Sequence, residues 1–118
     1  MDAPMIWLIS PDSDTRRLIG LNLSKRGFRV LEVSSEGELV SSWTKPQLII
    51  LDVDPPGKLK REVAEALRRN PWAQGTPLIL LLTIAPTPSQ LARLQPARWV
   101  EKPLAMNVLL ALVRECLA

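Results

Sequence analysis

Five short apolar segments, separated by stretches of helical spacing, run the length of the chain and limit the folds that it can adopt. They lie at 5–9, 28–33, 48–51, 77–82 and 98–100. The first, third and fourth segments are apolar on both faces, as is typical of parallel strands that helices cover on both sides. The second alternates apolar and polar residues, which indicates a strand nearer the edge of a sheet. We therefore predict five strands that alternate with helices.

The stretches between these segments carry the start and stop signals of helices. Helical spacing predicts helices over 15–26, 34–43, 58–70 and 104–117 and a short helix that begins near Thr87 or Pro88. Gly27 follows the first helix, after two basic residues, and suits the left-handed position that often ends a helix. Strands that alternate with helices form right-handed crossovers. The predicted fold is α/β and flavodoxin-like: a doubly wound sheet of five parallel strands in the order 2-1-3-4-5, with helices on both faces.

The composition favours one compact domain and excludes several kinds of catalytic site. The chain has 118 residues, 47% of them apolar, which fits a single domain over residues 1–118 and argues against disorder. It contains no histidine, so Ser-His-Asp and Cys-His catalysis and imidazole zinc ligands are excluded. Its one cysteine, Cys116, can form neither an intrachain disulfide nor a cysteine-based metal site.

Charge and hydropathy bear on partners and location. The net charge is +3, and the basic residues are mixed with acids along the chain, so we expect no nucleic-acid partner for this domain. The apolar stretches are too short to cross a membrane, and the N-terminus lacks the layout of a signal peptide. A lone cysteine also suits a reducing compartment. We therefore expect a cytoplasmic protein without membrane contact.

Polar residues gather where the predicted strands end. In a sheet of this kind, binding sites form beyond the carboxyl ends of the strands. The residues at these ends are Ser10, Pro11 and Asp12 after the first strand, Asp52 after the third, Thr83 after the fourth and Lys102 after the fifth. A carboxylate can attack phosphorus, and a hydroxyl and an ammonium can each bind a phosphoryl oxygen. The set suits a phosphoryl group, although Asp52 taken alone would also suit a plain turn.

At these positions the chain resembles the receiver domain of two-component response regulators, over essentially its whole length. Residues 48–57, Leu-Ile-Ile-Leu-Asp-Val-Asp-Pro-Pro-Gly, are similar to the strand and loop that carry the family's phosphoacceptor. Thr83 matches the family's switch hydroxyl, and Lys102-Pro103 matches its lysine and cis-prolyl turn. The resemblance implies that Asp52 accepts a phosphoryl group from a histidine kinase, and that Thr83 and Lys102 bind this group. It implies a signalling domain and not an enzyme.

The resemblance also suggests how such a domain would signal. Trp99 stands where the family has a switch aromatic residue, although it equally suits a core position on a short edge strand. The output face would be formed by the fourth helix, the fifth strand and the fifth helix, and we expect it to bind a signalling protein or a second copy of the chain. Through a cis bond to Pro103, Lys102 should lie within salt-bridge range of Asp52.

The acid pair that binds magnesium in receiver domains is degenerate in this chain. Ser10 and Pro11 take the positions of the two acids, and Asp12 keeps a carboxylate one step further along. Loss of one carboxylate beside a divalent ion removes an attraction on the order of 8 kcal/mol before solvation offsets it. The remaining ligands would be Asp12, Asp52 and a backbone carbonyl near Asp54. We therefore predict weak Mg²⁺ binding, and Asp12 could instead cap the helix that follows it.

Three functions stay open at this point. The chain is a phosphorylatable receiver, or a pseudo-receiver that keeps the fold and acts through protein contacts without phosphorylation. The branched Ile84, where the family has a small residue, could crowd the phosphoryl pocket and so favours the second. An unrelated flavodoxin-like binding module is less favoured, because no glycine-rich turn follows any predicted strand.

Overall fold

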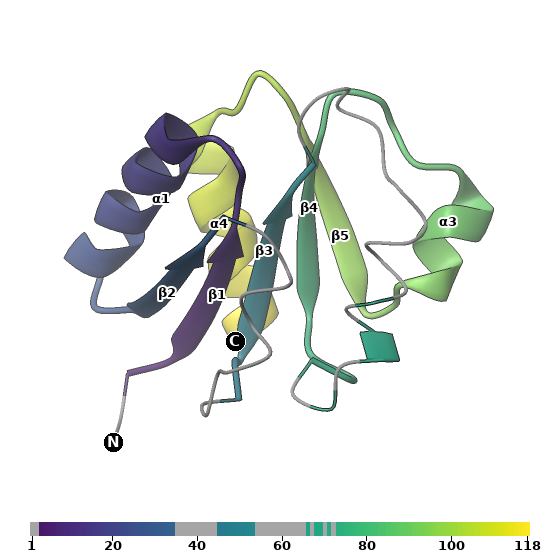
Figure 1. Cartoon of the computed structure of the whole chain (residues 1–118), viewed down its shortest axis with the longest axis horizontal. Coiled ribbons are helices and arrows are strands. Elements are labelled where there is room, and N and C mark those ends of the chain that lie inside the picture. Colours follow the sequence, from purple (N-terminus) through teal and green to yellow (C-terminus); the bar gives the residue numbers. More distant parts are fainter. Residues whose placement is uncertain (1–2, 35–44, 54–65, 67, 70, 72) are drawn as a thin grey trace.

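The computed structural model describes residues 3–34, 45–53, 66, 68–69, 71 and 73–118. Its centre is a sheet of five parallel strands in the order β2-β1-β3-β4-β5 (Figure 1). The strands are β1 (Met5–Ile9), β2 (Arg29–Val33), β3 (Leu48–Asp52), β4 (Leu78–Leu82) and β5 (Ala97–Glu101). The strand order and the parallel direction predicted from the sequence are both confirmed.

Burial along each strand follows its place in the sheet. Every residue of β3 and β4 is buried, as the continuous apolar runs predict for strands covered on both sides. The edge strand β2 buries only its last residue, Val33, which agrees with its alternating sequence. The centre of the sheet is therefore fixed by hydrophobic burial, and polar side chains can enter it only at the strand ends.

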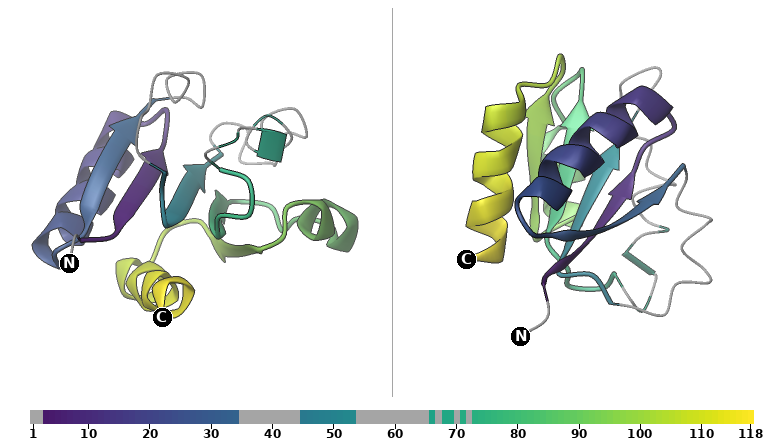
Figure 2. Two further views of the ribbon diagram at one scale, coloured as in Figure 1. Left: turned by 90° about the horizontal axis from the view of Figure 1, so that it is seen from below. Right: turned by 90° about the vertical axis from the view of Figure 1, so that its left-hand side faces the viewer.

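Three helices of the described chain cover the two faces of the sheet: α1 (Ser13–Lys25), α3 (Pro88–Arg93) and α4 (Met106–Leu117). Helices α1 and α4 lie on one face, and α3 lies on the other (Figure 2). The helix predicted over 34–43 lies outside the described residues apart from Ser34, and so does most of the one predicted over 58–70. Arg68 and Arg69, near the end of the latter, are helical. No helix among the described residues is long and apolar enough to cross a membrane.

Two separate cores flank the sheet because successive strand residues point to opposite faces. Ile6, Leu8 and Ile50 pack with Ile19 and Leu23 of α1 on one side. The other side holds the fully buried Trp7 together with Leu94, the residue that ends α3. Leu18 and Leu21, which share the helical spacing of α1, are 55% and 53% exposed and lie outside both cores.

The ends of the helices are formed as their sequences indicate. Thr87 caps α3 through a capping box with Gln90, and Pro88 occupies the first helical position, so the short helix begins where it was predicted. Gly27 follows α1 with a φ of 87°, a left-handed conformation that L side chains rarely adopt. The first helix therefore stops at a position that favours glycine.

Arg68 connects the backbone at the end of α3 to the loop before β4 through hydrogen bonds. Its guanidinium donates to the carbonyl oxygens of Ala73 and Thr76, both at 2.9 Å, and to that of Pro96 at 3.1 Å. It also donates twice to the carbonyl of Leu94, from Nε at 3.1 Å and from Nη2 at 2.5 Å. This side chain thus anchors the C-terminal end of α3 in addition to the buried Leu94.

Candidate functional site

The candidate site lies where β1 and β3 end side by side. In the parallel pairing of these strands, Ile9 is opposite Leu51, so the next residues, Ser10 and Asp52, are neighbours. Ser10 is fully buried and Asp52 is 4% exposed. Two polar side chains thus meet in an almost closed environment, where each needs a hydrogen-bonding or charged partner.

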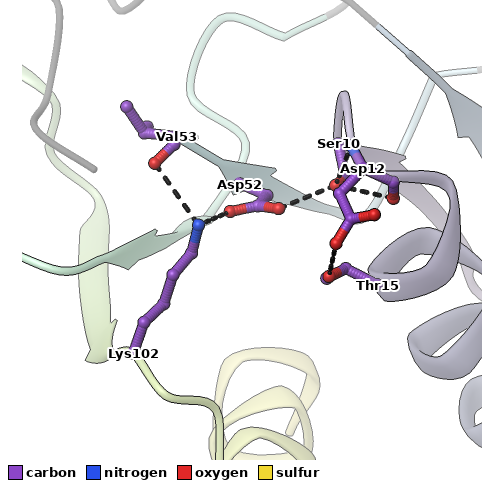
Figure 3. Close-up of polar contacts among 6 residues, drawn as sticks. All are labelled: Ser10, Asp12, Thr15, Asp52, Val53 and Lys102. Carbon is purple, nitrogen blue, oxygen red and sulfur yellow. Dashed lines mark hydrogen bonds and ion pairs between the residues drawn. The ribbon is translucent and has the colours of Figure 1, made fainter. Parts of the chain in front are cut away.

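Ser10 and Asp52 are joined by a direct hydrogen bond. The Ser10 hydroxyl donates to Asp52 Oδ2 over 2.7 Å (Figure 3). The same hydroxyl oxygen accepts the backbone N–H of Asp12 at 3.2 Å. Ser10, to which the sequence resemblance assigns an acid-pair position, therefore acts in this structure as a donor to the carboxylate.

Lys102 approaches Asp52 from the opposite side. Its ammonium group forms an ion pair with Asp52 Oδ1 and donates to the carbonyl oxygen of Val53 at 3.4 Å. Among the described residues, the Lys102 ammonium is the charged partner of Oδ1. The Lys102 backbone is held by a 2.8 Å bond from its N–H to the carbonyl of Leu82, and the Lys102-Pro103 bond is cis. The predicted proximity of Lys102 to Asp52 is confirmed.

Asp12 is turned towards its own helix. One carboxylate oxygen accepts the Thr15 hydroxyl at 2.5 Å, and the other accepts the backbone N–H of Asp14 at 3.2 Å. The bond from Thr15 holds the pKa of Asp12 below its ordinary value, with the N–H of Asp14 as the second cause. Of the two uses that the sequence left open for Asp12, the structure shows the helix cap. Figure 3 shows its carboxylate directed at Thr15.

The loop after β1 has a further support that the sequence reading missed. Arg16 Nη1 donates to the carbonyl oxygen of Ser10 at 2.6 Å. Thr15 lies three residues after the cap Asp12, a spacing at which side chains of a helix start commonly interact. That spacing could have identified Thr15 from the sequence, whereas nothing in the pattern singles out Arg16.

The remaining predicted residues are placed as follows. Thr83 follows β4 and is exposed, and the side chain of Ile84 is 54% exposed, so Ile84 is not packed into the site as its bulk suggested it could be. Trp99 in β5 is partly buried and packs against the core on the α3 face. Asp54 lies outside the described residues.

The carboxylates of the described site do not suit a magnesium ion in this arrangement. No group of three or more acidic, histidine or cysteine side chains comes together among the described residues. Both oxygens of Asp12 accept hydrogen bonds, and Asp52 Oδ2 faces the proton of Ser10. A divalent ion would have to share these oxygens with donors that already occupy part of each carboxylate.

Two hollows in the described part of the chain lie away from this site. One, of about 470 Å³, lies at the amino ends of β3 and β4 and is lined by Gln47, Thr76 and Cys116 among others. Burial raises the pKa of the Cys116 thiol, which keeps it in its less reactive protonated form. This hollow is therefore separate from the candidate site at the carboxyl ends of the strands.

Solved structures share this architecture over nearly the whole chain. The chemotaxis response regulator CheY4 of Vibrio cholerae superposes with a TM-score of 0.79 at 18% identity, and the match covers 97% of this chain and 98% of that one. This chain has the receiver-domain fold. A signal receiver domain of a histidine kinase from Syntrophus aciditrophicus matches 98% of this chain and 90% of its own, at 26% identity and a TM-score of 0.73. A response regulator from Thermotoga maritima matches 98% of both chains, with 20% identity and a TM-score of 0.76.

The comparison with solved structures thus supports the resemblance found in the sequence motifs. No family model matches the sequence, and no curated protein does. In this receiver fold the strand ends hold Asp52, Lys102 and Ser10 in one connected group.

Proposed function

We propose that this chain is a receiver domain of signal transduction, with Asp52 at its phosphoacceptor position and a histidine kinase or another signalling protein as its partner. The observation that carries this proposal is the pairing of Asp52 with Lys102 at the carboxyl edge of the sheet. A buried carboxylate beside an ammonium group is the arrangement expected where a phosphoryl group is received and its charge is balanced. The receiver fold supports the same assignment.

The route from this site to a partner would run through β5. Thr83 is exposed at the end of β4, where its hydroxyl is free to turn towards a phosphoryl oxygen on Asp52. Trp99 lies on β5, partly buried on the α3 side. The face formed by α3, β5 and α4 is the one that would bind the signalling partner or a second copy of the chain.

The hydrogen bonds of Ser10 and Asp12 favour a second form of this function, in which the domain does not depend on a bound metal ion. Ser10 has no carboxylate to offer a metal ion, and both carboxylate oxygens of Asp12 already accept hydrogen bonds. Phosphoryl transfer in aqueous sites depends on a cation that offsets the developing charge. We therefore propose that the domain works as a pseudo-receiver, whose protein contacts do not require magnesium-dependent phosphorylation. Magnesium binding at this site would be weak.

Intact-mass measurement after incubation with a small phosphodonor and MgCl₂ tests both forms. We expect little or no added phosphoryl group on the unaltered chain, and a gain when Ser10→Asp is combined with Pro11→Asp. Asp52→Asn in that background is the control and should abolish the gain. Rapid stoichiometric modification of the unaltered chain, lost on Asp52→Asn, would establish a phosphorylatable receiver. Modification that survives Asp52→Asn would contradict the assignment of Asp52 altogether.

A further inference from the structure

The negative charge of Asp52 lies in a buried site, between Ser10 and Lys102. A buried carboxylate must be balanced, and in a receiver site the sequence resemblance assigns part of that role to a bound Mg²⁺. We propose that in this protein the Ser10 hydroxyl takes over that role, so that Ser10 and Lys102 together hold Asp52 in a metal-independent state. The inference rests on the proposed function, which gives Asp52 the acceptor position.

The direction of the Ser10 hydrogen bond follows from its three polar contacts. A serine hydroxyl has one proton to donate and can accept on its oxygen. The N–H of Asp12 occupies an accepting position at 3.2 Å. The proton can go to Asp52 Oδ2 at 2.7 Å or to the carbonyl of Asp12 at 3.2 Å, and the shorter contact to a charged acceptor is the stronger one.

Burial makes this bond important for the stability of the fold. Ser10 is fully buried and the Asp52 side chain is 1% exposed, so water cannot replace a lost donor. Lys102 reaches Oδ1 and Ser10 reaches Oδ2, so each oxygen of the carboxylate has its own partner. The negative charge of Asp52 is thus offset by one cation and one hydroxyl of the protein itself.

Neither Pro11 nor Asp12 can restore a metal site in the described arrangement without breaking other contacts. The side chain of Pro11 has no oxygen, and its ring restricts the backbone between Ser10 and Asp12. Both oxygens of Asp12 are used at the start of α1. Turning Asp12 towards Asp52 would therefore uncap the helix and place two carboxylates together, which a weakly bound ion would have to offset.

Thermal unfolding with increasing MgCl₂, at constant ionic strength, tests the proposal without any phosphoryl transfer. The unaltered protein should show a midpoint that does not depend on MgCl₂. Ser10→Ala should lower the midpoint by several degrees and remain insensitive to MgCl₂. Ser10→Asp sets a second carboxylate against Asp52, so its midpoint should be low without the ion and rise saturably with it. Ser13→Asp, at an exposed position of α1, is the matched control and should not respond.

Two results would overturn the proposal. One is a saturable rise in the midpoint of the unaltered protein at sub-millimolar MgCl₂, which would show that the ion balances Asp52. The other is a Ser10→Ala midpoint equal to that of the unaltered protein, which would show that the hydroxyl does not hold the carboxylate. The second result can be obtained even if Ser10→Asp does not fold.

The results that would refute the role of Ser10 differ from those that would refute the receiver assignment. If the Ser10 variants behave otherwise but Asp52 accepts a phosphoryl group, the receiver assignment stands and only the role of Ser10 is wrong. Loss of the receiver assignment requires a different result, namely phosphoryl transfer that is indifferent to Asp52→Asn.

Discussion

Lys102 reaches the carboxylate of Asp52 although β4 lies between β3, which ends at Asp52, and β5, which Lys102 follows. The side chain of Lys102 is 19% exposed and that of Asp52 is 1% exposed, so the pair is largely shielded from water. Its ammonium also donates to the carbonyl of Val53, the residue after β3. Lys102 thereby connects the turn after β5 to the centre of the sheet.

Removal of the Lys102 ammonium should be strongly destabilising. Lys102→Met leaves a buried carboxylate without its counter-charge, and we expect a loss of about 3 kcal/mol in the free energy of unfolding. Asp52→Asn in the same chain should recover part of this loss, with a coupling of about 0.5–3 kcal/mol in a double-mutant cycle. Urea unfolding measures both, and Lys45→Met at an exposed position is the control. Additive losses from the two substitutions would contradict the pairing.

The cap on α1 should be visible in the titration of Asp12. The Thr15 hydroxyl holds the pKa of Asp12 below its ordinary value, so Thr15→Val should raise that pKa. Because the pKa is lower in the folded chain, Asp12 stabilises the fold above the ordinary pKa of aspartate, and this contribution is lost as pH falls through the lower, folded value. Carboxyl-carbon NMR gives the pKa directly. Ser24→Ala, on an exposed part of α1, should leave the pKa of Asp12 unchanged. An equal pKa of Asp12 in Thr15→Val and in the unaltered protein would refute the cap.

Arg68 should govern the stability of the region around α3. Arg68→Met removes donors from the carbonyls of Leu94, Ala73 and Thr76, and we expect a loss of about 1–3 kcal/mol. Arg68→Lys should recover only part of it, because an ammonium cannot reproduce the planar fork of a guanidinium.

Hydrogen exchange localises the effect of Arg68. The amide of Leu78 donates to the carbonyl of Pro96, which Arg68 also holds, and should exchange faster in Arg68→Met. The neighbouring Arg69 is exposed, so Arg69→Met is the matched control. Equal exchange rates in the two variants would rule out the anchoring role.

The sheet could be predicted from the sequence because burial leaves a direct pattern in it. The apolar runs that became β3 and β4 are apolar on both faces, and the parallel topology then brings Asp52 and Lys102 to one edge. The position of Thr87 and Pro88 likewise marked the start of α3.

The contacts of the site could be predicted only in part, because hydrogen-bond partners leave no periodic pattern. In the sequence, Ser10 stands out only because the resemblance leads us to expect an acid at its position. The 2.7 Å contact shows that its hydroxyl donates to Asp52. Asp12 had two uses of similar plausibility, and the nearby Thr15 and Asp14 decided between them. The anchor formed by Arg68 depends on carbonyls from two separate stretches, 73–76 and 94–96, so the order of residues does not reveal it.

The most direct test of this account is an NMR titration of the unaltered, ¹⁵N-labelled protein with MgCl₂, followed at the amides of Ser10 and Val53. These amides flank the hydrogen bond and the ion pair that hold Asp52. We predict no saturable change in their chemical shifts through the millimolar range, because Ser10 and Lys102 already balance the carboxylate. Saturable shifts at both amides with a sub-millimolar dissociation constant would contradict the metal-independent state of Asp52.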